Sequence, residues 1–344
     1  MQHSPQHSNF QSDSSSGPGT IHITAASDEK MAAGLGIGLF SIFRRSSGPI
    51  HARIVLDRVS DFHVRRFEAL ERQFGHRITV VEPTFRDQYS QAKRGSHVNQ
   101  VTYYRLNAVD YMDGVDRAIW FDTDILCLQD IRQLWNEDLK GQPLAAVYDP
   151  SFTEPTAEGK EIELLGSAFE DGYFNAGILL MDLATWRQED VKGTIQRHMR
   201  EDPLFGRFRD QSRLNWYFRA RWKHLPRRYN MQARLIGLQT VPLTPIDPAD
   251  FLRALVDPVI VHFNGPCKPW QKRTLHPYKK AYRQEWLDSP WRDWKPEEQV
   301  LSELRWQMGD FRKHWRRWIW VNNQIRNGVR EKSRAELQEA PAYR

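Results

Sequence analysis

The 344-residue sequence has few cysteines and no long hydrophobic run, and both absences limit what the protein can be. Its two cysteines, Cys127 and Cys267, form neither a disulfide framework nor a zinc-binding pattern, which favours a reducing, cytoplasmic setting. No run of about 18 apolar residues occurs, so no segment is expected to span a bilayer. The most apolar stretch, residues 31–43, is short and follows a leader without a basic n-region. We interpret it as a buried helix rather than a targeting segment.

Charge is the first positive feature of the sequence. Lysine and arginine number 49 against 43 aspartates and glutamates, which gives a formal net charge of +6. This excess favours an anionic partner: nucleic acid, acidic lipid or a phosphorylated substrate. Residues 1–19 are rich in Ser, Gln and His and predict a disordered leader.

Apolar segments of strand length alternate with segments of helical periodicity. Strands are expected at 21–26, 50–56, 78–81, 116–121, 144–148 and 176–180, and helices at 31–43, 61–74, 99–111 and 212–221. This alternation predicts a mostly parallel α/β sheet covered by helices on both faces. Ligands of such sheets bind beyond the carboxyl ends of the strands. Asp28, Asp122 and Asp124 follow strands and are therefore expected to converge on one cleft.

The stretch AIWFDTDILCL places Asp122 and Asp124 on either side of Thr123. Two such carboxylates can bind a hard divalent cation that bridges phosphates. The pattern is weak alone, because it arises roughly once or twice by chance in a chain of this length. A solvated turn is one alternative. Another is a metal-dependent phosphatase of haloacid-dehalogenase type, with Asp122 as nucleophile and Asp124 as acid/base; such enzymes usually have Thr or Val where this chain has Leu126.

Four downstream motifs favour a different enzyme class. They are YFNAGILLMDLATWR at 173–187, DQSRLN at 210–215, LPRRYN at 225–230 and HFNGPCKPW at 262–270. With the Asp-x-Asp triplet, their order and spacing resemble glycosyltransferase family 8 from about residue 21 to about 285. The TYYRL segment at 102–106 makes the bacterial lipopolysaccharide galactosyl- and glucosyltransferases the more similar branch. The resemblance implies a catalytic domain over 20–290 with a nucleotide-diphospho-sugar transferase (GT-A type) fold, a Rossmann-like mixed sheet with helices on both faces.

The resemblance also implies a set of site residues. Asp122, Asp124 and His262 are expected to bind Mn²⁺ (or Mg²⁺), a mixed ligand set that suits this metal. Lys268 and Gly265 are expected at the diphosphate. The remaining nucleotide-sugar contacts are expected from Ala25, Ala26, Asp28, His97, Arg105, Thr123, Asn175 and Ala176, and the catalytic groups are Gln211, Asp149 and Asp210. Each also has a structural interpretation; Asp210 and Gln211, for example, suit the start of a helix.

The family retains the anomeric configuration of the transferred sugar. The resemblance implies transfer of a hexose, galactose or glucose, from a UDP-sugar to a saccharide or glycolipid acceptor in lipopolysaccharide or surface-glycan synthesis. A retaining glycosidase uses a carboxylate nucleophile. This chain has Gln211 at the matching position, and a neutral amide is a poor nucleophile. We therefore expect the acceptor hydroxyl to attack on the same face, with the leaving phosphate accepting its proton and Gln211 orienting the sugar.

The C-terminal region, residues 295–344, is basic, aromatic and periodic. Its apolar residues at helical spacing are Leu301, Leu304, Met308, Phe311, Trp315, Trp318 and Ile325, with arginines among them. The pattern predicts an amphipathic helical tail that either packs on the enzyme or, as we favour, contacts an anionic membrane surface. The protein is then expected in the cytoplasm, peripherally associated with the inner face of the membrane. Nucleic-acid binding is not favoured, and a non-catalytic membrane adaptor is the second alternative to the enzyme.

Overall fold

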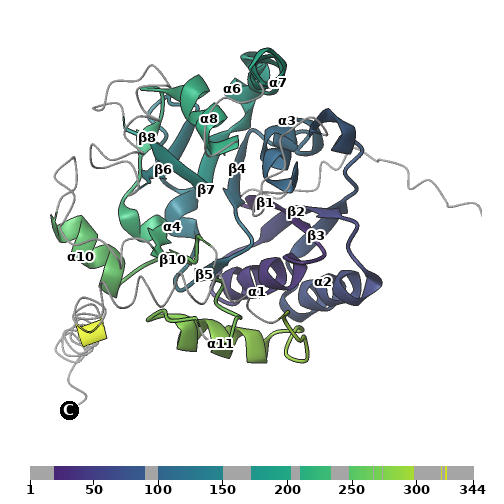
Figure 1. Ribbon diagram of the computed structural model, residues 1–344, viewed down its shortest axis with the longest axis vertical. Coiled ribbons are helices and arrows are strands. Elements are labelled where there is room, and N and C mark those ends of the chain that lie inside the picture. The colour runs from purple at the N-terminus through teal and green to yellow at the C-terminus, as the bar shows by residue number, and fades with distance from the viewer. Residues whose placement is uncertain are drawn as a thin grey trace, which may run out of the picture.

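A seven-stranded sheet forms the centre of the computed structural model, with strand order β3-β2-β1-β4-β7-β6-β8 (Figure 1). The structure describes residues 19–89, 100–149, 172–202, 210–233, 248–265, 267–272 and 274–297, together with Ile319, Asn322 and Asn323. The strands of this sheet are β1 (Ile21–Asp28), β2 (Ile50–Asp57), β3 (Arg77–Val81), β4 (Arg117–Phe121), β6 (Leu144–Tyr148), β7 (Phe174–Asp182) and β8 (Lys223–His224). The pairs β3-β2, β2-β1, β1-β4 and β6-β8 are parallel, whereas β7 runs antiparallel to both β4 and β6. The expected mixed α/β sheet is confirmed.

Helices cover both faces of the sheet, as the alternating pattern predicts. One face carries α1 (Ala32–Phe43) and α2 (Asp61–Phe74), with α11 (Lys279–Asp288) packed beyond α1. The other carries η2 (Gln100–Asn107), α3 (Ala108–Tyr111), α6 (Leu183–Gln188), α7 (Val191–Glu201) and α8 (Asp210–Phe218). The short elements η1 (Arg86–Tyr89), α4 (Arg132–Trp135), η5 (Arg227–Tyr229) and α10 (Pro248–Val256) complete the helices with described bounds.

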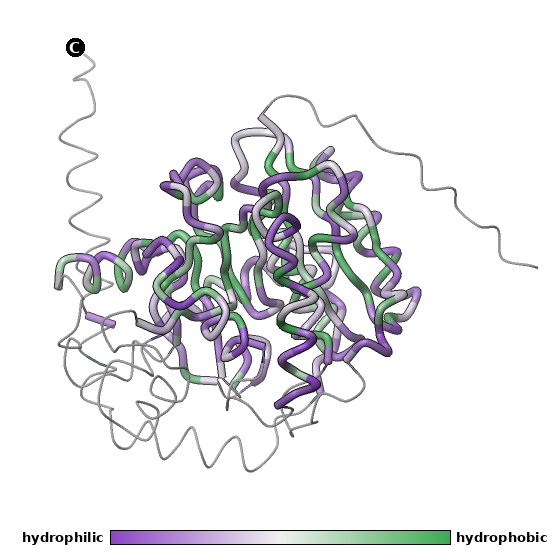
Figure 2. The backbone as a smooth tube through the Cα atoms, turned by 90° about the horizontal axis from the view of Figure 1, so that it is seen from above, coloured by the Kyte–Doolittle hydropathy of each residue, from purple (hydrophilic) through white to green (hydrophobic). Residues whose placement is uncertain are grey.

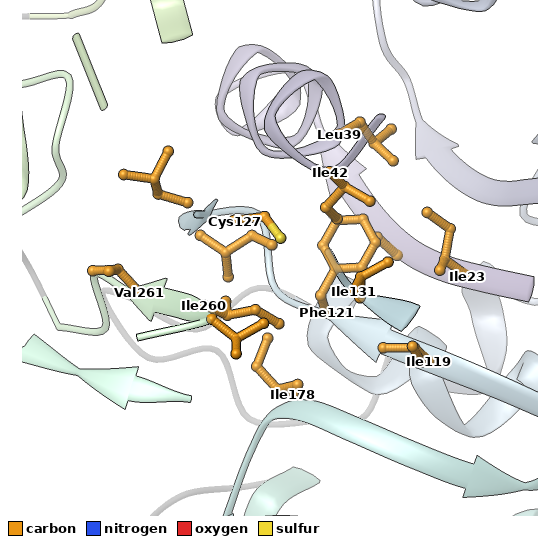
Figure 3. Packing of buried hydrophobic residues seen from close by; sticks show 14 of the residues in the cluster. Ile23, Leu39, Ile42, Ile119, Phe121, Cys127, Ile131, Ile178, Ile260 and Val261 are labelled. Atoms are coloured by element: carbon orange, nitrogen blue, oxygen red, sulfur yellow. The ribbon is translucent and has the colours of Figure 1, made fainter. Parts of the chain in front are cut away.

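Alternation along the strands divides the core into two clusters. In β4, Ile119 and Phe121 pack on the α1 side, whereas Ala118 and Trp120 pack on the α8 side, because successive side chains of a strand point to opposite faces. Figure 3 shows the first cluster, in which helix α1 lies over the strand residues. The hydrophobic colour of Figure 2 accordingly concentrates in the central strands. Both faces of the sheet are therefore buried, as the apolar strands predict.

A second, three-stranded sheet joins distant parts of the sequence. It has the order β5-β10-β9, formed by β5 (Ile125–Cys127), β10 (Ile260–His262) and β9 (Met231–Gln232). Strand β10 pairs antiparallel with β5, and His262 is the register partner of Ile125. This pairing brings the segment after residue 260 directly beside the Asp-x-Asp triplet.

An irregularity interrupts the pairing of β7 with β6. Ala146 is the register partner of Leu179, but the next residue, Val147, is the partner of Asn175. Three residues of β7, Ala176 to Ile178, therefore bulge out of the ladder with β6, and their backbone groups on that side are released for other partners.

The expected helix at 99–111 needs correction, and several other expectations fall outside the described residues. The segment 99–111 is not one α-helix: residues 100–107 form the 3₁₀ helix η2 and only Ala108–Tyr111 is α-helical. Apolar periodicity alone does not separate 3.0 from 3.6 residues per turn over so short a segment. Within the described part of the chain, no helix is long and apolar enough to cross a membrane. The leader, His97 and nearly all of the tail lie outside the described residues.

Candidate metal and sugar site

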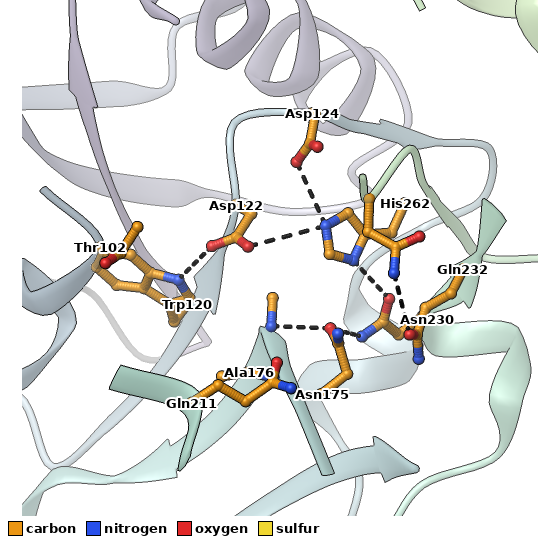
Figure 4. A network of polar contacts seen from close by, with 12 residues as sticks. Thr102, Trp120, Asp122, Asp124, Asn175, Ala176, Gln211, Asn230, Gln232 and His262 are labelled. Atoms are coloured by element: carbon orange, nitrogen blue, oxygen red, sulfur yellow. Dashed lines mark hydrogen bonds and ion pairs between the residues drawn. The ribbon is translucent and has the colours of Figure 1, made fainter. Parts of the chain in front are cut away.

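Asp122, Asp124 and His262 form one cluster at the carboxyl end of β4 (Figure 4). Each offers a ligand atom, and the three atoms lie within 4.8 Å of one another. His262 Nε2 is 3.3 Å from Asp124 Oδ1 and 3.8 Å from Asp122 Oδ2. The β5-β10 pairing is the cause, since it fixes the end of β10 against the triplet, and Phe263 N donates to Asp124 O over 2.9 Å. An imidazole and two carboxylates are donors that suit a divalent metal.

Lys268 adds a positive charge to this cluster. Its Nζ lies 2.5 Å from Asp124 Oδ2. Burial by itself raises the pKa of Asp124, but the charges of Lys268 and His262 outweigh it and hold the pKa well below the usual value. Asp124 is therefore ionised at neutral pH. The loop that carries Lys268 also contains Gly265 at φ +101°, a backbone conformation that favours glycine, and apart from its two chain neighbours no atom of the described residues would lie within 4 Å of a Cβ added there.

Arg105 ties the triplet to helix α8. Its Nη2 is 3.0 Å from Asp122 Oδ1, and its Nε is 3.0 Å from Asp210 Oδ2. The guanidinium also lies over the ring of Trp120, 5.0 Å from the centroid, and Trp120 Nε1 donates to Asp122 Oδ1. Burial raises the pKa of Asp210, while Arg105 opposes that rise. Arg105 and Asp210 are thus buried internal partners that hold Asp122 in place.

The bulge in β7 supplies four backbone groups to the site. Ala176 N donates to Gln211 Oε1 over 3.0 Å, and Gly177 N donates to Asn175 Oδ1 over 3.0 Å. On the carbonyl side, Gly177 O accepts from Asp122 N over 2.8 Å, and Ala176 O accepts from Arg105 Nη1. All four bonds end on residues expected in the site. The bulge is therefore the backbone frame on which the site is assembled.

Two side-chain amides converge on one carboxylate. Asn175 Nδ2 and Gln211 Nε2 donate to Asp149 Oδ2 over 3.0 and 3.1 Å. Asp149 directly follows strand β6, Asn175 lies in β7, and Gln211 lies in the first turn of α8, so three separate parts of the chain meet here. Both ends of the Gln211 amide are hydrogen-bonded, which fixes its orientation.

Sequence reasoning assigned no role to two residues of this site, Asn230 and Gly177. Asn230 is fully buried; its Oδ1 lies 3.0 Å from His262 Nδ1, and its Nδ2 donates to Asn175 Oδ1 over 3.0 Å. A Cβ on Gly177 would lie 2.2 Å from His262 Cε1, so any larger residue requires the imidazole or the strand to shift. Both residues belong to the motifs LPRRYN and YFNAG, so their position in a motif was the available signal.

The expected nucleoside-binding residues lie at the end of β1. The Ala25 side chain is buried on the α1 side of the sheet and that of Ala26 on the other, so mainly backbone and the strand end are available to a ligand there. Asp28 is partly exposed, and its Oδ1 accepts from Met31 N over 3.1 Å. Thr123, which lies between Asp122 and Asp124 in the sequence, is buried. His97 lies outside the described residues, so its expected role stays a prediction.

The arrangement of the strands matches that of solved glycosyltransferases. The galactosyltransferase LgtC, in complex with donor and acceptor sugar analogs, superposes with a TM-score of 0.70 at 23% identity over 78% of this chain and 96% of that one. The bifunctional glycosyltransferase WbbM gives a TM-score of 0.68 at 19% identity over 80% and 50% of the two chains. These likenesses identify the fold as that of a glycosyltransferase.

The family follows from the sequence comparison. The model of glycosyl transferase family 8 matches residues 22–274, and the chain belongs to this family. Among similar proteins, General stress protein A of Bacillus subtilis is 29% identical over 76% of this chain and 91% of its own length. Lipopolysaccharide 1,3-galactosyltransferase of Salmonella typhimurium is 25% identical over 79% of each chain. The expected family and the expected enzyme class are thus confirmed, and the phosphatase and adaptor hypotheses are set aside.

Proposed function

We propose that this glycosyltransferase moves a hexose, galactose or glucose, from a UDP-sugar to a saccharide or glycolipid acceptor, with retention of configuration. The observation that carries the proposal is the Asp122–Asp124–His262 cluster beside Lys268. Relatives named as lipopolysaccharide 1,3-galactosyltransferase and lipopolysaccharide 1,2-glucosyltransferase support a hexose and an acceptor in surface-glycan synthesis.

The ligand set fits a divalent cation, for which we propose Mn²⁺ with Mg²⁺ as the alternative. Asp122, Asp124 and His262 would hold it, and it would supply Lewis-acid stabilisation of the departing diphosphate. Lys268 lies against the same cluster and adds a positive charge where negative charge develops on the leaving group. Gly265 lets the backbone of the same loop approach the phosphates closely.

Gln211 suits an orienting role on the sugar. Its amide is held at both ends, by Ala176 N and by Asp149 Oδ2. A fixed neutral amide can position a hydroxyl or support positive charge on the sugar, but it is a weak nucleophile. This supports same-face attack by the acceptor hydroxyl, whose proton passes to the leaving phosphate. The carboxylate of Asp149 lies beside Gln211 and adds negative charge next to an oxocarbenium-like sugar.

The proposal is tested with a panel of nucleotide sugars and Mn²⁺. We expect hydrolysis or transfer of UDP-galactose or UDP-glucose, and no hydrolysis of a phosphate monoester. NMR of the product anomer separates retention from inversion. Turnover that is unchanged by removal of divalent metal would contradict the metal role. Inverted product would contradict the same-face mechanism without affecting the metal assignment.

We also propose that the tail, residues 295–344, places the enzyme on an anionic membrane surface, peripherally on the inner face of the cytoplasmic membrane. The support is its sequence, in which Arg312, Arg316 and Arg317 surround Trp315 and Trp318. The full chain should co-sediment with anionic vesicles and lose this on simultaneous substitution of the three arginines by glutamate. Vesicles of zwitterionic lipid are the control. Binding that survives the triple substitution would favour a tail that packs on the enzyme.

A further inference from the structure

The directions of the hydrogen bonds behind the metal cluster can be fixed from the backbone. A backbone N–H can only donate, so the Asn175 atom that faces Gly177 N at 3.0 Å is the amide oxygen. Asn230 presents an amide atom to that same oxygen, also at 3.0 Å, so this atom must be its NH₂ group. The oxygen of Asn230 then faces His262.

This order determines the state of the imidazole. Asn230 Oδ1 lies 3.0 Å from His262 Nδ1 and accepts, so Nδ1 carries the proton. The other ring nitrogen, Nε2, lies 3.3 Å from Asp124 Oδ1 and 3.8 Å from Asp122 Oδ2, so it is the nitrogen that faces the proposed metal cluster. A metal-binding histidine needs such a partner on its second nitrogen to fix its tautomer and ring orientation.

The same amide continues toward the sugar side. From Asn230 the hydrogen bonds run through Asn175 to Asp149 and from Asp149 to Gln211. The Gln211 end is fixed independently, because Ala176 N donates to its oxygen over 3.0 Å. Two successive N–H groups of the β7 bulge thus set the direction of every bond in the series.

We propose that Asn230 is a positioning residue with two roles. Its oxygen fixes His262 as the Nδ1–H tautomer, and its NH₂ group couples that ligand to Asn175 on the sugar side of the site. The side chain is fully buried and 3.0 Å from both neighbours. The proposal rests on the metal role in the proposed function, although the tautomer can be measured without metal.

Two variants separate the two roles. Asn230→Asp keeps an oxygen for His262 Nδ1 but has no NH₂ group for Asn175. Asn230→Leu has similar volume and can do neither. Asn107→Leu is the matched control: Asn107 is equally buried and bonds Tyr89, Gln88 and Asp110, away from the metal cluster. If removing any buried amide lowers Mn²⁺ affinity or kcat through a general loss of stability, the Asn107→Leu control should show the same loss.

The first readout is the ¹⁵N spectrum of histidine-labelled, metal-free protein in the slightly alkaline range, with the His262 signals assigned by loss in His262→Gln. We expect a proton on His262 Nδ1 in the wild type and in Asn230→Asp, and its loss in Asn230→Leu. An unchanged tautomer in folded Asn230→Leu overturns the first role. The same loss in Asn107→Leu also overturns it, because the effect would then be general.

The second readout is Mn²⁺ affinity, measured by electron paramagnetic resonance in the presence of UDP, together with kcat. Asn230→Leu should bind Mn²⁺ about 10–100-fold more weakly, the usual effect of losing such a partner, and Asn107→Leu should bind as the wild type does. In Asn230→Asp, kcat should fall by a larger factor than the affinity for Mn²⁺ does. Equal factors for kcat and Mn²⁺ affinity overturn the coupling role. If folded wild-type protein binds no Mn²⁺ but shows the Nδ1–H tautomer, the metal proposal fails and the tautomer role of Asn230 stands.

Discussion

Substitution of Gly177 by alanine is the most local way to disturb the proposed metal site without touching a ligand. The added Cβ would lie 2.2 Å from His262 Cε1, 2.8 Å from His262 Nδ1 and 2.9 Å from Asn175 Oδ1. Carbon atoms in contact sit about 3.5–4.0 Å apart. The imidazole must therefore move by more than about 1 Å, or β7 must shift by a similar distance.

Either movement has a cost that can be estimated. Overpacking of this kind destabilises a fold by about 1–3 kcal/mol. For the reaction, a misplacement of about 1 Å is enough to lower the rate by about 10²-fold. We expect Gly177→Ala to stay folded and to lower Mn²⁺ affinity and turnover by about 10²-fold, because the clash falls on the imidazole of the proposed metal site.

The assay pairs Mn²⁺ titration with urea unfolding of the same samples. Gly38→Ala is the control, because its Cβ would meet Ile125 Cγ1 at 3.2 Å, a contact that a small shift relieves. Gly38 lies in α1, where alanine is the better helix former. It should therefore keep both affinity and stability. Wild-type Mn²⁺ affinity in Gly177→Ala would refute the assignment of His262 as a ligand held against the bulge.

Three further predictions use single substitutions. Asp124→Ala should abolish activation by Mn²⁺, since it removes one carboxylate of the cluster; unchanged Mn²⁺ activation contradicts its role as a ligand. Gln211→Ala should lower kcat while UDP-sugar affinity, measured by calorimetry, stays largely intact; equal losses of affinity and rate contradict the sugar-side assignment. Burial lowers the pKa of His276 to about 3. As the pH falls below 6.5, this imidazole binds a proton in the unfolded chain but not in the folded one. The free energy of unfolding therefore decreases as the pH falls. Between pH 6.5 and pH 5 this costs about 2 kcal/mol, and urea unfolding of His276→Gln should lack that part of the slope.

Much of the fold could be read from the sequence because its strands are apolar runs that end in aspartate. β1 ends at Asp28 and β4 is followed by Asp122, and both strand ends lie on the edge where a parallel sheet binds ligands. The clustering of Asp122 with His262 was inferred from motif resemblance. No periodicity of the sequence specifies that β10 pairs with β5, yet this pairing produces the contact.

Other features of the site were beyond sequence reasoning for physical reasons. The Phe-Asn-Ala-Gly segment reads as part of an ordinary buried strand, because a bulge changes the backbone pairing without changing the apolar pattern. Arg105 is expected to line the donor pocket, and that expectation stays a prediction; its ion pairs with Asp122 and Asp210 were not foreseen from the sequence. The direction of the Arg105 side chain depends on the carboxylates it pairs with. These belong to Asp122 after β4 and to Asp210 in α8, both distant from Arg105 in the sequence.

The bulge in β7 gives this site two backbone donors of fixed polarity. A regular strand would use the N–H and C=O groups of Ala176 and Gly177 in pairing with its neighbours. Here both N–H groups donate to side chains instead, and they direct the amides of Gln211 and Asn175. Backbone donors cannot reverse their polarity, whereas side-chain amides can flip. The bulge therefore imposes one hydrogen-bond direction on Asn175, Asn230 and Gln211, and the Asn230 oxygen at the end of that series faces His262 Nδ1.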